Sequence, residues 1–358
     1  MQTLINLLIF FLILTAIITI HEFGHFVAAK MFGVYCGAFS IGMGPKIYGK
    51  KGKETEFQIR ALPIGGFVTM AGETDQEEET EFKDVPKERS LKGKKTYQKV
   101  IIFLAGIFNN FLLGFLILMV LNTTVGTIPV EQPVIGQVVA DSGAETAGIQ
   151  AGDTITEIAY DGKIFAIDHF DDITKALTVK NAANKSVTIK VTLIRDGEKL
   201  TVNVNAGYNS KVSRYQMGII PATRKMGFGE AIGSTFTEVG SMALMVFTAL
   251  KGLALHFSST VKQMSGPVGI YSVTAQVAST GNVANLFYLM ALLSINIGVF
   301  NLLPIPGLDG AHTLIALVEG VLHRELPQNV KYGLQLAGLA LVLLLMLYIT
   351  FQDIMKLL

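Results

Sequence analysis

Two histidines and a glutamate occupy the end of a long apolar segment near the start of the chain. The residues His21-Glu22-Phe23-Gly24-His25 fit the pattern H-E-x-x-H. Residues four positions apart share one face of a helix, so both imidazoles can reach a single zinc ion. Glu22 can then face a water on that ion, whose pKa falls towards ~7, and remove its proton as a general base. The spacing therefore indicates zinc-assisted hydrolysis.

The low chance frequency of this motif and its position in the chain both favour a functional role. Six His and seventeen Glu in 358 residues give roughly 0.005 expected occurrences of it. Leu4 to His21 is about 27 Å of helix at ~1.5 Å per residue, which places the motif near the far end of a membrane-spanning segment. Polar side chains there are costly unless they are paired or bind metal. The alternative is a pair of interfacial histidines beside a helix-end carboxylate.

A catalytic zinc needs a third protein ligand and an open fourth position. Asp309 is the best candidate, because Pro304 and Pro306 would end the preceding helix and turn a carboxylate back towards the bundle. The local sequence Pro-Gly-Leu-Asp-Gly is by itself ordinary turn chemistry. Only the H-E-x-x-H helix shifts the preference from a turn to a ligand.

The composition predicts a membrane protein. Hydrophobic residues make up 50% and charged residues 16% of the chain, where a soluble domain carries about 25% charged residues. This excludes a simple cytosolic enzyme, a disordered chain and a fibrous chain. The net charge of +1 implies no nucleic-acid-binding surface. The single cysteine, Cys36, excludes an internal disulfide and a cysteine-rich metal site.

Uncharged apolar runs predict four transmembrane helices, each near the ~20 residues that a span requires: residues 4–20, 100–121, 286–303 and 333–351. The first run lacks the basic start and cleavage site of a signal peptide, so we read it as a permanent span. Lysines and an arginine crowd the start of the second. They predict a cytoplasmic 30–99 loop, an active site near the cytoplasmic face, and both termini outside the cell.

The segment 230–257 has an apolar face at helical spacing but only twelve uncharged residues between Glu238 and Lys251. An interfacial helix is therefore expected. If this segment crossed as an additional span, Asp309 would lie on the opposite side of the membrane from His25. On this reasoning the interfacial helix and the zinc site depend on each other.

Two further regions have strand-like patterns. Apolar residues alternate over 187–193, and Asp161-Gly162 and Asp196-Gly197 mark hairpin turns, with a short helix over 169–180, so residues 122–222 predict a soluble outside domain. Phe57–Met70 predicts a hairpin around Pro63–Gly66. Its edge, including Gly65, Gly66 and Phe67, could pair with an unwound substrate, which an intramembrane protease needs because a helix hides its carbonyl groups.

Asn296 and Asn301 are polar residues within the third predicted span. Their separation of five residues places them about 140° apart on a helix. They either join helices through their amides or hydrogen-bond substrate backbone and the developing oxyanion.

These motifs, taken together, resemble the bacterial site-2 proteases, the membrane-embedded zinc metalloproteases that include the regulator-of-sigma-E proteases. The matching segments are HEFGHF, PIGGFVTMAGE, AGIFNNFLLGF, SGPVGI and SINIGVFNLLPIPGLDGAH. The resemblance implies His21, His25 and Asp309 as Zn²⁺ ligands, Glu22 as catalytic base, and Asn296 and Asn301 as substrate-binding residues. It also implies that 57–70 is a membrane-reentrant β-loop. Where relatives commonly have A-G-P-x-x-N, this chain has Ile107 in place of the proline.

The middle region resembles a single PDZ domain. Residues 134–138 resemble its carboxylate-binding loop and first strand, and residues 142–155 the following helix and strand. Such a domain captures a C-terminal strand by edge pairing, or here could admit only substrates whose outer domain has been removed.

The expected fold is a multi-pass α-helical membrane protein with an inserted α+β domain. It divides into two halves of a protease core (1–121 and 286–358), the PDZ-like domain (122–222) and an interfacial helix with gating segment (223–285). The expected function is intramembrane zinc proteolysis in the bacterial cytoplasmic membrane, on pre-trimmed single-span proteins such as anti-sigma factors or on signal peptide remnants. The alternatives are a non-catalytic PDZ-bearing scaffold and a transporter, the latter disfavoured by the lack of repeated halves.

Overall fold

The computed structural model describes residues 2–73, 82–178, 185–210, 213–261 and 264–357. The chain forms two compact units. The helical unit comprises Met1–Leu121 and Ile232–Leu358, and the strand-rich unit comprises Asn122–Ala231. The segments 1–121 and 286–358, which we separated by sequence, thus belong to one unit together with residues 232–285, while residues 223–231 belong to the other.

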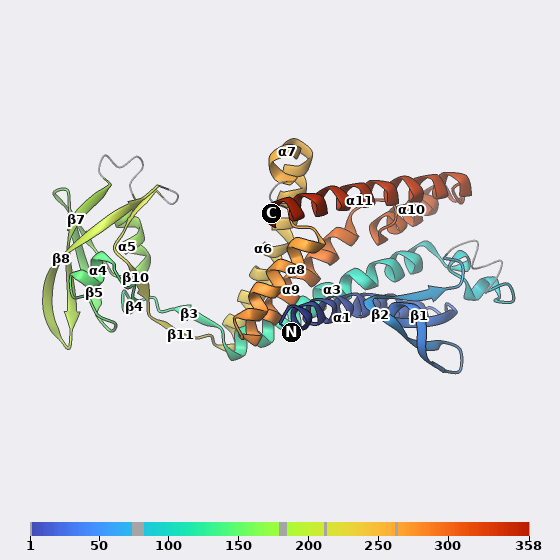
Figure 1. Ribbon diagram of the computed structural model, residues 1–358, viewed down its shortest axis with the longest axis horizontal. Coiled ribbons are helices and arrows are strands. Elements are labelled where there is room, and N and C mark those ends of the chain that lie inside the picture. Colours follow the sequence, from blue (N-terminus) through green and yellow to red (C-terminus); the bar gives the residue numbers. More distant parts are fainter. Residues whose placement is uncertain (1, 74–81, 179–184, 211–212, 262–263, 358) are drawn as a thin grey trace. The chain divides into compact units, whose positions relative to one another are not determined.

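The helical unit contains five long apolar helices, as expected for a multi-pass membrane protein: α1 (Gln2–Met31), α3 (Thr96–Thr124), α6 (Phe228–Leu255), α9 (Val283–Leu302) and α11 (Gln328–Leu357) (Figure 1). All five are long and apolar enough to cross a membrane, so the predicted number of four spans is not confirmed. Its shorter elements are η1 (Lys87–Arg89), η2 (Leu91–Gly93), α7 (Phe257–Thr260), α8 (Pro267–Ser279) and α10 (Asp309–Leu322).

The directions of α1, α3 and α9 follow from their contacts. Asn110 of α3 meets His21, whereas Ile102, earlier in α3, meets His25, so α1 and α3 are antiparallel. In α9, Leu289 shares a core cluster with Ile13 and Ile17, while the later residue Asn301 reaches His21. Since α9 runs parallel to α1, it begins at the same end of the bundle at which α3 stops.

This geometry removes the predicted dependence of Asp309 on an interfacial α6. The chain leaves α3 and re-enters α9 at one end of the bundle, whatever path α6 takes in between. Met242 and Val246 of α6 pack with Ala291 and Ile295 of α9, and α8 then packs against α1 through Ile270. The predicted dependence considered α6 alone because α8 was not expected as a helix; whether α6 crosses the membrane stays a prediction.

A β-sheet formed by β1 (Cys36–Lys51) and β2 (Glu56–Met70) lies beside α1. The predicted hairpin around 63–66 is wrong. Phe39 pairs with both Phe57 and Val68, so residues 38–41 lie between the two arms of β2, which do not pair with each other there. Both strands are strongly bent, and Gly65 adopts a φ of 76° that favours glycine at the bend.

The strand-rich unit is built around a five-stranded sheet of order β6-β5-β7-β8-β9. The elements are β3 (Thr127–Pro129), β4 (Ile135–Val138), α4 (Gly143–Thr146), β5 (Thr154–Tyr160), β6 (Lys163–Ala166), α5 (Phe170–Leu177), β7 (Ser186–Arg195), β8 (Glu198–Asn209), β9 (Arg214–Gln216), β10 (Ile219–Pro221) and β11 (Thr223–Lys225). Strand β4 pairs with β10, and β3 pairs with β11.

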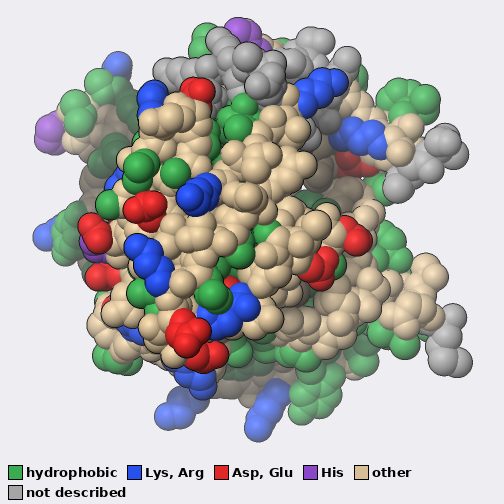
Figure 2. All heavy atoms as spheres, turned by 90° about the vertical axis from the view of Figure 1, so that its left-hand side faces the viewer, with side chains coloured by type: hydrophobic (Ala, Val, Ile, Leu, Met, Phe, Trp, Pro, Cys, Tyr) green, Lys and Arg blue, Asp and Glu red, His purple; other side chains and the backbone are tan. Residues whose placement is uncertain are grey.

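Local turn chemistry fixes two hairpins of this sheet. Asp161-Gly162 joins β5 to β6, and Asp196-Gly197 joins β7 to β8, all four residues with positive φ. This is the turn geometry that matches strand twist, and both predicted turns are confirmed. The alternating residues Ile189, Val191 and Leu193 are buried in the core. Seen from the side of β7 and β8, acidic and basic side chains are interspersed on the surface, as expected for a face in water (Figure 2).

A cavity of about 320 Å³ in the strand-rich unit lies between α5 and residues 214–219. Its walls include Phe170 and Ile173 on one side and Met217 and Ile219 on the other. Residues 134–138, predicted as the carboxylate-binding loop and first strand, are not among the residues that line it. Most of that segment is strand β4, which pairs with β10, and Ile135 is buried in the core.

Candidate metal centre

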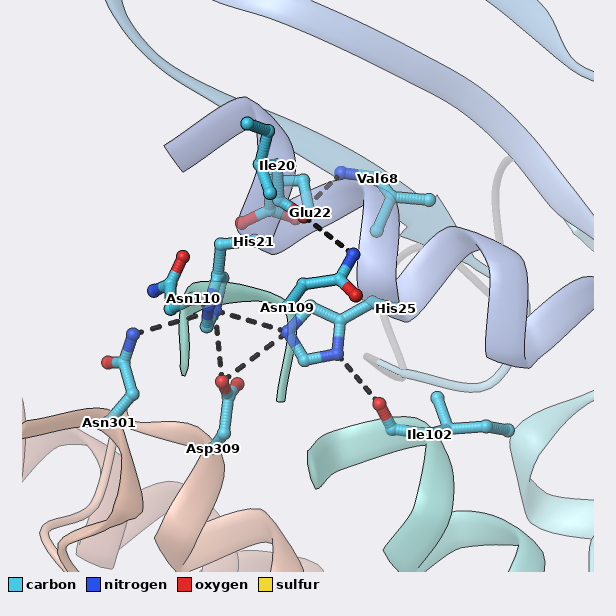
Figure 3. Close-up of polar contacts among 10 residues, drawn as sticks. All are labelled: Ile20, His21, Glu22, His25, Val68, Ile102, Asn109, Asn110, Asn301 and Asp309. Carbon is cyan, nitrogen blue, oxygen red and sulfur yellow. Dashed lines mark hydrogen bonds and ion pairs between the residues drawn. The ribbon is translucent and has the colours of Figure 1, made fainter. Parts of the chain in front are cut away.

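His21, His25 and Asp309 meet at one point of the helical unit (Figure 3). Both histidines lie on one face of α1, and Asp309 is the first residue of α10. Nε2 of His21 is 3.2 Å from Nε2 of His25 and 3.0 Å from Oδ2 of Asp309, and the third separation is 3.3 Å. The two segments predicted to supply ligands, which lie 284 to 288 residues apart in the sequence, are thus brought together.

The donor set fits a zinc ion. Asp309 Oδ2 is buried, has no hydrogen-bond donor among the described residues, and faces two imidazole nitrogens. Three electron-pair donors in contact repel one another unless a cation or proton lies between them. Ligands about 2.0–2.1 Å from a tetrahedral zinc are roughly 3.3 Å apart, close to the spacings here. Three protein ligands also leave the fourth position that a catalytic metal requires.

The orientation of His25 is set by a carbonyl group. Its Nδ1 lies 2.8 Å from the carbonyl oxygen of Ile102, which can only accept a hydrogen bond. Nδ1 therefore carries the ring proton and donates it, so that Nε2 presents its lone pair to Asp309 and His21.

Two glycines allow α1 and α3 to approach closely at this site. A Cβ atom on Gly24 would lie 2.3 Å from the carbonyl oxygen of Ala105, and one on Gly106 would lie 2.3 Å from Nε2 of His25. Neither contact is possible for a larger residue without displacing backbone or a ligand. Gly106 thus lies directly against both imidazoles.

Glu22 lies on α1 between the two histidines and faces β2. Its Oε2 accepts a hydrogen bond of 3.2 Å from the backbone N–H of Val68, and it is within electrostatic range of both histidines and Asp309. Earlier in the same strand, Thr15 of α1 donates to the carbonyl oxygen of Pro63. The strand 63–68, with Gly65, Gly66 and Phe67, therefore runs along α1 up to Glu22.

The two asparagines of α9 have different environments. Asn301 Nδ2 is 3.5 Å from Nε2 of His21 and so lies at the edge of the cluster. Asn296 is half-buried one and a half turns earlier and makes none of the described hydrogen bonds that join the cluster. The 140° separation accounts for this, since one helix face cannot point both residues at one metal.

Comparison with known proteins agrees with this geometry. Residues 9–345 match peptidase family M50. The chain belongs to peptidase family M50. It is 34% identical over 342 residues to the protein named "putative zinc metalloprotease" in Clostridium perfringens, covering 95% of this chain and 96% of the relative. It is 31% identical over 423 residues to zinc metalloprotease RasP of Bacillus licheniformis, covering 97% and 98%. The resemblance to site-2 proteases is confirmed, and the protein is a metalloprotease.

Sequence reasoning missed three residues of this M50 peptidase that support the ligands. Gly106 contacts both imidazoles, Asn110 contacts His21, and Asn109 Nδ2 donates to the carbonyl oxygen of Ile20 at 3.0 Å. All three belong to the segment AGIFNN of α3, which served in the sequence prediction only as evidence of resemblance to the site-2 proteases. The available signal was a pair of adjacent amides inside an apolar span, where unpartnered polar groups are costly.

Proposed function

We propose that this M50 peptidase is an intramembrane zinc endopeptidase that cuts transmembrane segments. The observation that carries this is Asp309 Oδ2, a buried carboxylate oxygen without a donor, facing the Nε2 atoms of His21 and His25. An ordinary structural carboxylate would be hydrogen-bonded at such a place.

His21, His25 and Asp309 would hold the zinc. When bound, zinc polarises the scissile carbonyl and lowers the pKa of water at its open position. Glu22, which the helix presents beside the ligands, accepts the proton of the attacking water and returns it to the leaving amine. The N–H of Val68 keeps the carboxylate of Glu22 directed to that side.

The substrate binds as an extended strand along residues 63–70, the second arm of β2. A helical segment hides its carbonyl groups in its own hydrogen bonds, so an unwound segment must replace those bonds elsewhere. The strand 63–70 is suited to this because it runs along α1 and ends beside Glu22. Asn301, at the edge of the cluster, is placed to donate to the developing oxyanion, whereas Asn296 acts further along the substrate backbone.

The substrates are single-span membrane proteins already shortened outside, such as anti-sigma factors, or signal peptide remnants, in the bacterial cytoplasmic membrane. Lys and Arg before α3 favour an active site near the cytoplasmic face. The start of α1 and the end of α11 lie at one end of the helical unit, in keeping with both termini being outside (Figure 1). The strand-rich unit acts as a PDZ domain, and the cavity between α5 and residues 214–219 is its peptide site.

The test is Glu22→Gln in the full-length protein in detergent. The amide cannot accept the water proton, so cleavage of a transmembrane substrate should fall about 10²–10⁴-fold while zinc content stays unchanged. Glu56→Gln, which neutralises a glutamate of β2 bonded to Lys46, is the matched control and should cut normally. Membrane peptides that accumulate in a Glu22→Gln strain, identified by mass spectrometry, would name the substrates. Normal cleavage by Glu22→Gln would contradict the role of Glu22 as general base, whereas absence of cleavage by the unchanged, zinc-loaded protein would favour a binding role.

A further inference from the structure

Asn110 lies on α3 directly behind His21, one turn after Gly106. Its side chain is fully buried (0% exposed). The amide nitrogen Nδ2 is 3.2 Å from Nδ1 of His21, while the amide oxygen Oδ1 is buried and has no hydrogen-bond partner in the described part of the chain. Its backbone carbonyl accepts a bond of 2.9 Å from the hydroxyl of Ser294, so α9 holds this part of α3 in place.

The position of the N–H proton on the His21 ring determines whether the oxygen or the nitrogen of the Asn110 amide must face that ring. Nε2 of His21 points at Nε2 of His25 and Oδ2 of Asp309, so it must offer a lone pair if the three hold a metal. A neutral imidazole has one N–H, which then belongs to Nδ1. A donor at Nδ1 cannot bond to the NH₂ group of Asn110, only to an oxygen.

We propose that Asn110 is a positioning residue for the zinc, whose amide oxygen accepts the Nδ1–H of His21. The two ends of a carboxamide have nearly the same shape, and rotating it by 180° places Oδ1 at the 3.2 Å position. Each zinc-binding histidine then has its own oxygen acceptor, the carbonyl of Ile102 for His25 and the amide of Asn110 for His21. The inference rests on the proposed zinc centre.

Such an acceptor fixes the ring orientation and raises the basicity of Nε2, and its loss costs about 10–100-fold in metal affinity. The rotation also places Nδ2 at the buried position that Oδ1 now has, where the oxygen has no partner among the described residues. An aspartate carries two acceptors and no N–H. It should therefore serve His21 at least as well as the native amide.

The test measures zinc affinity of the full-length protein in detergent, by competition with a chromophoric chelator. Asn110→Leu should bind zinc about 10–100-fold more weakly, and Asn110→Asp should bind at least as tightly as the unchanged protein. Cobalt substitution gives a second readout, since the visible absorption of the ion reports its coordination geometry and should change in Asn110→Leu but not in Asn110→Asp. Asn6→Leu, which removes another buried amide of the helical unit, bonded to Gln2, is the matched control.

Unchanged zinc affinity in Asn110→Leu would overturn the inference, as would equal weakening in Asn110→Asp and Asn110→Leu, because the amide nitrogen or the shape would then matter. If Asn110→Leu does not fold, Asn110→Asp decides alone, and a loss of zinc as large as that of His21→Ala overturns the role. His21→Ala distinguishes a failure of the proposed zinc centre from a failure of the proposed role of Asn110. If it binds zinc like the unchanged protein, the proposed zinc centre is wrong; if it loses zinc while Asn110→Leu does not, only the role of Asn110 is wrong.

Discussion

Two carboxylates with buried oxygen atoms, Asp153 in the strand-rich unit and Asp309 in the helical unit, differ in which groups surround those oxygens. Asp153 in the strand-rich unit has a side chain 1% exposed, and it accepts bonds of 2.7 Å from Nε and from Nη2 of Arg195 and one of 2.8 Å from the N–H of Gln150. Asp309 in the helical unit has a side chain 19% exposed, and its Oδ2 is buried and faces two imidazole nitrogens without a donor.

The difference separates a structural carboxylate from a functional one. The three bonds of Asp153 join the start of β5 to the end of β7, so folding alone accounts for the residue. Nothing comparable satisfies Asp309 Oδ2. The structure tolerates this arrangement at a cost that a bound cation would remove. Loss of Asp153 should thus affect stability, and loss of Asp309 should affect metal binding and activity.

The largest effect is expected for Asp309→Ala. Residues behind metal ligands change affinity by about 10–100-fold, so the loss of a ligand should weaken zinc binding by more than about 100-fold and abolish cleavage. Thermal unfolding of the metal-free protein should not be lowered, because the change removes a carboxylate that no donor stabilises. Zinc competition, substrate cleavage and unfolding with excess chelator measure the three quantities.

Unfolding of the metal-free protein tests the difference between Asp309 and Asp153 directly. A fall in unfolding temperature of metal-free Asp309→Ala, as large as that of Asp153→Ala, would mean that Asp309 is a structural carboxylate after all. Chelation of the unchanged protein should lower its stability, and added zinc should restore it, whereas chelation should leave Asp309→Ala unaffected.

Asp153→Ala should have the opposite profile. Removing one partner of a buried pair leaves the other charge unpaired, and because Arg195 is partly exposed we expect a loss of about 2–3 kcal/mol in the strand-rich unit. Hydrogen exchange of the β5 and β7 amides in the full-length protein measures it. Zinc affinity should be unchanged. The control is Asp161→Asn, which removes a carboxylate that joins no described ion pair, keeps a residue that tolerates the positive φ of this turn, and should cost less.

The same pair predicts a response to acid. Burial by itself would raise the pKa of Asp153, but the guanidinium of Arg195 and the N–H of Gln150 hold it below its usual range. The unfolded carboxyl takes up a proton near pH ~3.9, the folded one only at lower pH. The contribution of Asp153 is therefore complete above that value and is lost as the pH falls through the folded pKa.

Exchange protection of β7, corrected for the intrinsic rates, should accordingly decrease more between pH 5 and pH 3 in the unchanged protein than in Asp153→Asn, by a factor of at most about ten. Equal pH dependence in the two proteins would show that the bonds from Arg195 and Gln150 do not lower the pKa of Asp153.

The residues that sequence could assign are those whose geometry is local. The spacing of His21 and His25 places them on one helix face, and the Asp-Gly pairs dictate their own turns. Residues 38–41 between the two arms of β2, and Asn110 behind His21, depend instead on contacts between distant segments. No periodicity in the chain encodes them. Asp309 falls between the two cases, since its prolines indicated a turn but only the H-E-x-x-H motif gave that turn a function.

A third buried carboxylate tests how far the contrast extends. Asp353 near the end of α11 accepts bonds of 2.8 Å from the N–H groups of Gly266 and Gly269, the first turn of α8. Both donors are satisfied, so Asp353 should behave like Asp153. Asp353→Asn keeps an acceptor but loses the charge, which should cost about 1 kcal/mol, the difference between charge-assisted and neutral bonds at a helix start. Faster exchange in α8 with unchanged zinc affinity is the expected result. Weaker zinc binding would instead mean that α8 helps position α1, against which it packs, and that a fully bonded carboxylate can still serve the site.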